Sequence, residues 1–284
     1  MGRVRGPLQC HSGHVTELNL RDHVDGVGAI MAGTANVIMQ LSLPPVGYGV
    51  VESKVESGQV TKHPFKRFRT TFSFLAVAML GTDDDRRAMR KAIDTAHVHV
   101  RSDESSPVKY NAFDPDLQLW VAAAIFWGAE DVMQKLRGPL DPELKDAFYE
   151  HGARFATTLQ VKPDMWPVDR QAFDEYWDQT LSRLHIDDTV RHYLQGLIDY
   201  TFMPKPFRRV MGPLHRLLTV GFLPPFWREQ MHVAWTDADQ KRFDRVVRVV
   251  AAVNRRMPQI VRAFPFNYML WDVRRRIRTG KRLV

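Results

Sequence analysis

The sequence predicts an all-α protein built as a single compact multi-helix domain, and three observations lead to this fold class. Apolar residues recur at intervals of three and four over long stretches, as in helices with one buried face. Capping acceptors, namely Asp83 and the pairs Asp114-Pro115 and Asp141-Pro142, precede several of these stretches. Strand-like alternation is scarce, and Gly47-Tyr48-Gly49 lacks the third glycine of a dinucleotide-binding turn.

Three segments are expected along the 284 residues: an irregular N-terminal arm over 1–26, a helical domain over 27–272 and a basic C-terminal tail over 273–284. The single cysteine, Cys10, excludes an intramolecular disulfide and any metal site that needs paired thiolates. No apolar run reaches the roughly 20 residues needed to cross a bilayer, and no secretion signal is visible. A cytoplasmic location is therefore expected.

The formal net charge of +8 does not by itself indicate a nucleic-acid partner, because most of the basic residues are scattered. The exception is the run from Arg274 to Arg278, continued by Lys281 and Arg282. Two interpretations of this run are open: a solvated helix end or tail, or a peripheral contact with anionic lipid head groups. We expect no nucleic-acid partner, and a possible peripheral membrane contact.

The segment from Pro64 to Leu80 predicts the first helix that matters for function. Its expected core stripe consists of Phe65, Phe68, Phe72, Leu75 and Met79. Lys66, Arg67, Arg69 and Thr70 are interleaved with these aromatic residues and border the apolar face. Such groups are either surface side chains whose aliphatic stems cover apolar neighbours, or cations and donors that line a pocket for an anionic ligand.

The next helix, predicted over Asp83–Val100, contains an inward-facing histidine. His97 falls on the apolar stripe four residues after Ile93 and eight after Met89, whereas His99 is rotated by about 200° and should face away. An inward imidazole is either a hydrogen-bonded core residue or a ligand to a metal or haem iron. No second ligand at metal-binding spacing accompanies His97, so a single inward histidine suits haem better than zinc.

Helical spacing continues in the remaining two thirds of the chain. The stretch that begins at Asp114 carries a wide apolar face through Val132, and shorter stripes run over 173–181 and 243–253. Prolines between Pro204 and Pro225 predict short helices separated by turns.

Four blocks of sequence resemble the family that contains MpaB-type oxygenases and the latex-clearing rubber oxygenases. These blocks are Pro45–Ser53, Arg67–Thr71 with Leu80-Gly81-Thr82, Ala96–Arg101 and Tyr110–Val121. The resemblance covers about Pro44 to Pro225, and the more distal C-terminal part is similar to actinobacterial members. It implies a buried pocket for haem b. The family pattern His-x-x-Val matches His97 and Val100, which implies that His97 is the proximal iron ligand.

The resemblance also implies residues for the distal face of the haem. A basic residue followed by threonine matches Arg69 and Thr70, Lys66 lies one turn earlier, and the upstream carboxylate matches Glu52. Glu52, Arg69 and Thr70 are thus the candidate catalytic residues, and His97, Lys66 and Arg69 the candidate cofactor-binding residues.

The implied activity is a dioxygen-dependent oxidation or cleavage of a C=C bond in a small hydrophobic, isoprenoid-like substrate. Many family members read Trp-Val-His-Ala-Thr-Leu where this chain has alanines at Ala122 and Ala124, which puts the distal chemistry in doubt. The alternative is a haem- or lipid-binding protein without turnover. The sequence leaves the substrate and the oligomeric state open.

Overall fold

The computed structural model describes residues 20–53, 55 and 59–284, so most of the predicted N-terminal arm lies outside the described residues. The described part is all-α, as predicted, and its only β-type pairing is an isolated bridge between Arg101 and Asn111. The elements in order are η1 (Leu20–His23), α1 (Gly26–Leu41), α2 (Pro44–Val51), α3 (Pro64–Leu80), α4 (Asp83–His97), α5 (Pro115–Arg137), α6 (Pro142–Thr158), η3 (Pro163–Met165), α7 (Arg170–Leu181), α8 (Asp188–Ile198), α9 (Lys205–Phe222), α10 (Pro225–Gln230), α11 (Asp237–Asn254), α12 (Gln259–Arg262) and α13 (Phe266–Arg278).

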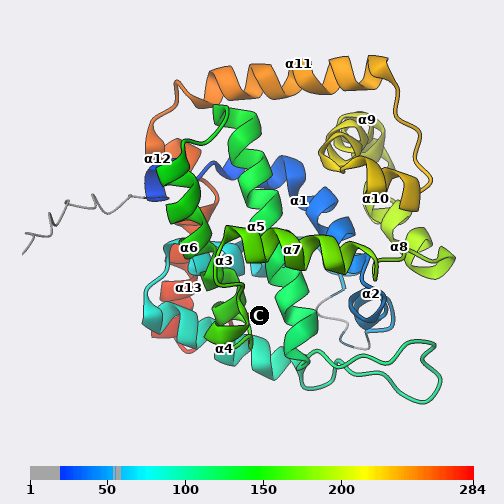
Figure 1. Ribbon diagram of the computed structural model, residues 1–284, viewed down its shortest axis with the longest axis vertical. Coiled ribbons are helices and arrows are strands. Elements are labelled where there is room, and N and C mark those ends of the chain that lie inside the picture. The colour runs from blue at the N-terminus through cyan, green and yellow to red at the C-terminus, as the bar shows by residue number, and fades with distance from the viewer. Residues whose placement is uncertain (1–19, 54, 56–58) are drawn as a thin grey trace, which may run out of the picture.

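The long helix α5 runs through the middle of the molecule and packs against α1, α6 and α11 (Figure 1). Its residue Phe126 is fully buried at the centre of an aromatic cluster. The ring centroids of Phe148, Tyr149, Trp166 and Phe173 lie 5.0–5.8 Å from that of Phe126. Large aromatic side chains bury much apolar area, so this cluster fixes α5, α6 and α7 as one core.

Two of the three capping residues that the sequence predicts are confirmed. Asp114 accepts a hydrogen bond from the Asp116 amide at 2.9 Å, and Asp141 accepts one from Leu144 at 2.8 Å. The prediction for Asp83 is wrong by one residue. The capping residue is Thr82, which exchanges hydrogen bonds with Asp85 in a capping box, because Asp85 stands at the third helical position and can reach back to the Thr82 amide.

The predicted core stripe of α3 is only half confirmed. Phe72 is buried, but Phe65 is 79% exposed and Phe68 is 40% exposed. The helices α6 and α13 pack on α3, and its buried residues all lie between Phe72 and Ala78. The first two turns of α3 are therefore not covered, and they present aromatic side chains to solvent.

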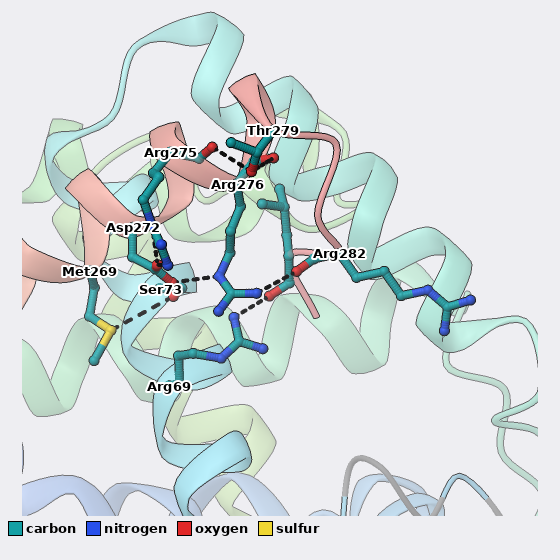
Figure 2. Close-up of polar contacts among 9 residues, drawn as sticks. Arg69, Ser73, Met269, Asp272, Arg275, Arg276, Thr279 and Arg282 are labelled. Atoms are coloured by element: carbon teal, nitrogen blue, oxygen red, sulfur yellow. Dashed lines mark hydrogen bonds and ion pairs between the residues drawn. The ribbon is translucent and has the colours of Figure 1, made fainter.

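The predicted boundary between the helical domain and a basic tail falls inside α13. Val273 is buried, and so is Leu283 near the end of the chain. Figure 2 shows Arg275 and Arg276 turned back onto Asp272, at 2.6 Å and 2.5 Å, and Arg69 of α3 directed at the chain end. Residues 273–284 therefore belong to the folded domain rather than to a loose tail.

The junction of α1 and α2 is a sharp bend around a buried serine. Ser42 donates a hydrogen bond to the Met39 carbonyl at 2.6 Å and accepts one from Trp227 Nε1 at 2.9 Å. Among the described residues, no single helix is both long and apolar enough to cross a membrane. Only α1 and α2 taken together have the length and composition of a membrane span, and the two helices are bent by 111° relative to each other.

Candidate functional site

His97 is the last residue of α4 and lies on the inner side of that helix. Ile93 and Met89, one and two turns earlier, are 7% and 0% exposed, and the imidazole itself is partly buried. Phe113, from the loop before α5, packs edge-on against the ring, with the two centroids 6.5 Å apart. His99 is exposed. His97 therefore faces inward and His99 faces solvent, as helical spacing predicts.

The Nδ1 atom of His97 is buried without a hydrogen-bond partner, one of few such atoms in the described part of the chain. Burial lowers the pKa of His97, the positive charge of Arg67 lowers it further, and Gln160 and Asp94 oppose that shift. Gln160 thus lies near the ring without completing a hydrogen bond of normal geometry to Nδ1. An unpaired buried donor costs on the order of 1–3 kcal/mol, so it needs a reason.

A partly buried polar network surrounds Gln160. Gln118 of α5 is buried; its amide nitrogen donates to the Ala112 carbonyl at 2.6 Å, and its carbonyl oxygen accepts from the Gln160 backbone amide at 2.6 Å. The side chains of Gln118 and Gln160 also bond to each other, and Gln160 donates to Asp94. This network fixes the environment of the imidazole, as supporting groups do around a ligating histidine.

Arg67 is the cation that acts on His97. Its side chain is accessible to solvent, yet burial lowers its pKa and Tyr193 of α8 acts in the opposite direction. Among the residues that the structure describes, no carboxylate forms an ion pair with Arg67. We call the surroundings of His97, Gln160 and Arg67 the His97 site.

The other basic residues of α3 point elsewhere. Arg69 donates from Nη1 to the Leu283 carbonyl at 3.0 Å. It lies one turn before Ser73, whose hydroxyl is 3.9 Å from the sulfur of Met269 in α13 (Figure 2). Arg69 therefore lies on the side of α3 that faces α13, about 200° around the helix from Arg67. Thr70 donates to the Arg67 carbonyl at 3.0 Å, and Lys66 is partly buried.

Glu52 follows α2 and is held by two hydroxyl groups. Its Oε2 atom accepts hydrogen bonds from Tyr110 at 2.9 Å and from Ser106 at 2.8 Å. Both donors lie in the loop between α4 and α5, which also carries Phe113. The structure thus joins Glu52 to the loop beside His97. The catalytic roles predicted for Glu52, Arg69 and Thr70 stay predictions.

No group of three or more His, Cys, Asp or Glu side chains in the described residues could hold a metal ion. Haem makes a different demand, because the porphyrin supplies four nitrogen ligands and the protein adds one or two. An inward imidazole and a cation without a carboxylate partner, which could bind a propionate, are both present at the His97 site. The residues therefore fit haem better than a bare ion.

Comparison with known proteins places the chain in a family. The catalytic domain described as ER-bound oxygenase mpaB/B'/Rubber oxygenase matches residues 20–252. The chain belongs to this family. It is 50% identical over 250 residues to the uncharacterized proteins Rv2237 of Mycobacterium tuberculosis and Mb2261 of Mycobacterium bovis, which covers 88% of this chain and 98% of each relative. No solved structure matches.

Membership of the mpaB/rubber oxygenase family confirms the resemblance and supports an oxygenase-type function. Sequence reasoning missed Arg67 as a candidate for the site. The sequence has three cations within four residues, so it does not show which of them is free to bind a ligand. Helical spacing could have indicated it, because Arg69 is in register with Ser73 and Ala76 on the packed face of α3, whereas Arg67 is not.

Proposed function

We propose that this chain is a haem b-dependent oxygenase that acts on a C=C bond of a small hydrophobic, isoprenoid-like substrate, with His97 as the iron ligand. The observation that carries the proposal is the pairing of the inward His97, whose Nδ1 is unpaired, with the uncompensated charge of Arg67 in a domain of the oxygenase family. When bound, haem would supply the iron that binds dioxygen.

The residues at the His97 site have distinct roles in this proposal. His97 would ligate the iron through one imidazole nitrogen, and the nearby Gln160 would influence which tautomer of the ring is present. Arg67 binds a propionate or balances negative charge on oxygen, and Lys66 is the second cation available for the propionates. Arg69 and Thr70 keep the distal roles that the family resemblance implies.

Glu52 is the proposed proton acceptor of the reaction. Tyr110 and Ser106 hold its Oε2 atom, so Oε1 is the oxygen that can take a proton from the substrate. Phe113, which packs on the His97 ring, is 41% exposed, and Phe68 at the start of α3 is 40% exposed. Apolar surface of this kind can pack against a porphyrin ring and a hydrophobic substrate.

The decisive test is the absorption spectrum of protein purified after expression with ample haem. The parent chain should show a Soret band, His97→Ala should lose it, and His99→Ala should keep it, because His99 points into solvent two residues away. Colourless parent protein, or a Soret band that survives in His97→Ala, would contradict the assignment.

A haem- or lipid-binding protein without turnover is the second candidate, favoured by one observation. Ala122 and Ala124 are fully buried, so they place no polar group at the positions where many family members carry one. The two candidates differ in products. Reduced, haem-loaded protein should be mixed with air and an unsaturated isoprenoid, and aldehyde or ketone fragments sought by mass spectrometry. Their absence across several substrates favours the binder.

A further inference from the structure

Exposed aromatic residues form a line that begins in the turn before α13 and continues along the outer side of that helix. Phe264, Tyr268 and Trp271 are 57%, 49% and 51% exposed, at spacings of four and three residues. The ring centroids of Phe264 and Tyr268 are 6.5 Å apart, and those of Tyr268 and Trp271 are 5.6 Å apart. The opposite side of α13, which includes Met269 and Val273, is buried and packs on α3. We call this outer line, with α12, the aromatic edge.

Arginines continue the aromatic edge along the same side of α13. Arg275 lies over the ring of Trp271 at 5.2 Å, and Arg278, one turn further, is exposed. From Arg255 to Val284 the sequence holds nine arginines or lysines and one acidic residue. That acid, Asp272, is buried and already paired with Arg275 and Arg276. Arg274 is paired with Asp85 of α4. The edge therefore shows no exposed negative side chain, and its net positive charge comes from Arg278 and from the pair Arg275 and Arg276, which share one carboxylate.

The short helix α12 widens the aromatic edge. Ile260 is 73% exposed and Val261 is 49% exposed. Ile260 and Trp271 both line a cavity of about 380 Å³, which also touches Arg274. The exposed apolar residues of the two helices thus adjoin one groove with a cation at its margin. Contiguous apolar surface of this kind, rimmed by charge, marks an interaction site.

We propose that the aromatic edge, formed by α12 and the outer side of α13, binds the surface of an anionic lipid bilayer. Tyrosine and tryptophan favour the interface between head groups and acyl chains, and arginines beside them are attracted to acidic lipids. The edge lies beyond residues 20–252, so it is not part of the matched oxygenase domain. The proposal does not depend on haem.

Two other occupants suit the edge less well. In a symmetric dimer, the aromatic edges of two copies would pack on each other, which would bring arginines of both copies, Arg275 and Arg278, into one interface. Single-stranded nucleic acid would need free aromatic faces for base stacking, but Arg275 already covers Trp271, and Ile260 and Val261 offer no ring. The test below distinguishes both from a membrane.

The experiment measures co-sedimentation of the full chain with vesicles of equal parts phosphatidylglycerol and phosphatidylcholine, and with phosphatidylcholine alone. Binding should favour the anionic vesicles and weaken between about 0.1 M and 1 M salt, as the Debye length falls from about 10 Å to about 3 Å. The double variant Ile260→Glu, Tyr268→Glu should bind at least about tenfold less, because it removes apolar contact and adds two repelling charges.

The matched control is Val210→Glu on α9. Val210 is 75% exposed, close to the 73% of Ile260, and α9 lies across the molecule from α12 (Figure 1). The control should bind like the parent, and both variants should keep the parent melting temperature, because the substituted side chains are exposed. A second readout uses Trp271, the only tryptophan of the described chain that is exposed. Brominated lipid should quench its fluorescence, and Trp271→Phe should remove that quenching while binding persists.

Four results would overturn the proposal. The first three are equal binding of the parent and the double variant, binding without preference for anionic lipid, and loss of binding in Val210→Glu alone. The fourth is absence of vesicle binding together with dimerisation, or with oligonucleotide binding, that the double variant abolishes. The last pair would assign the edge to a second copy or to nucleic acid instead.

Discussion

Two residues of the candidate site have properties that their own helices do not explain. His97 keeps a buried Nδ1 atom unpaired, which costs free energy because a polar group removed from water needs a partner. Arg67 is exposed and has no carboxylate partner among the described residues. An anionic ligand at the His97 site would pair with Arg67. At the scale of single residues, these two features support a binding function for the His97 site.

Replacement of Arg67 and of Arg69 should have different effects. Arg67→Gln should lower the affinity for haem about tenfold with little change in stability, because it removes the charge-assisted contact with a propionate at the His97 site. Arg69→Gln should lower the melting temperature, because its guanidinium holds the chain end at Leu283. Haem titration and thermal unfolding of both variants measure this. If Arg69→Gln leaves stability and haem intact but abolishes dioxygen chemistry, the catalytic role implied by the family resemblance is right.

At the scale of elements, one aspartate ties three helices together. Asp25 directly precedes α1, makes no side-chain cap to that helix and is 6% exposed. Its carboxylate accepts a hydrogen bond from Arg137 Nε at 2.6 Å and another from Asn254 Nδ2 at 2.7 Å. Arg137 ends α5 and Asn254 ends α11. Because α5 also carries Gln118 and the aromatic core, this contact helps to keep the scaffold of the site in place.

Asp25→Ala should destabilise the protein by about 3 kcal/mol, because it leaves Arg137 and the buried Asn254 without their acceptor. Asp22→Ala is the matched control. Asp22 is exposed and uses its backbone carbonyl, not its side chain, to accept from Arg137. Chemical unfolding of the two variants gives the comparison. Equal stabilities would mean that the Asp25 contact adds nothing to the packing of α1, α5 and α11.

At the scale of the whole molecule, the C-terminal segment closes over α3 and joins distant parts of the chain. Arg274 bonds to Asp85 of α4 at 2.8 Å, and the Arg276 side chain donates to the Arg282 carbonyl at 3.1 Å. Leu283 is buried and accepts a hydrogen bond from Arg69. The last residues therefore belong to the packing of α3, the helix that also positions Arg67.

Deletion of Leu283 and Val284 should cost about 2 kcal/mol of unfolding free energy, because a buried leucine and the acceptor for Arg69 are lost. The double substitution Lys281→Ala, Arg282→Ala should cost much less, because both side chains are exposed and the Arg282 carbonyl remains. Differential scanning calorimetry compares the two. A deletion without effect would return the segment to the status of a solvated tail.

The sequence alone determined the features that depend on local spacing. Apolar intervals and capping residues predicted the helices, the 100° rotation per residue predicted an inward His97 and an outward His99, and four short blocks predicted the oxygenase family. These are properties of single segments. Each can be recognised without knowing where the rest of the chain lies.

Only the tertiary structure decided which neighbours those segments meet. Phe65 and Phe68 have the spacing of core residues but are exposed, because α6 and α13 cover only the second half of α3. Arg69 binds the chain end more than 200 residues away in sequence, whereas Arg67 is exposed and its positive charge lowers the pKa of His97. Burial and pairing depend on contacts between distant segments. Those contacts, rather than helical periodicity, left Arg67 without a carboxylate partner at the His97 site and left the outer side of α13 exposed.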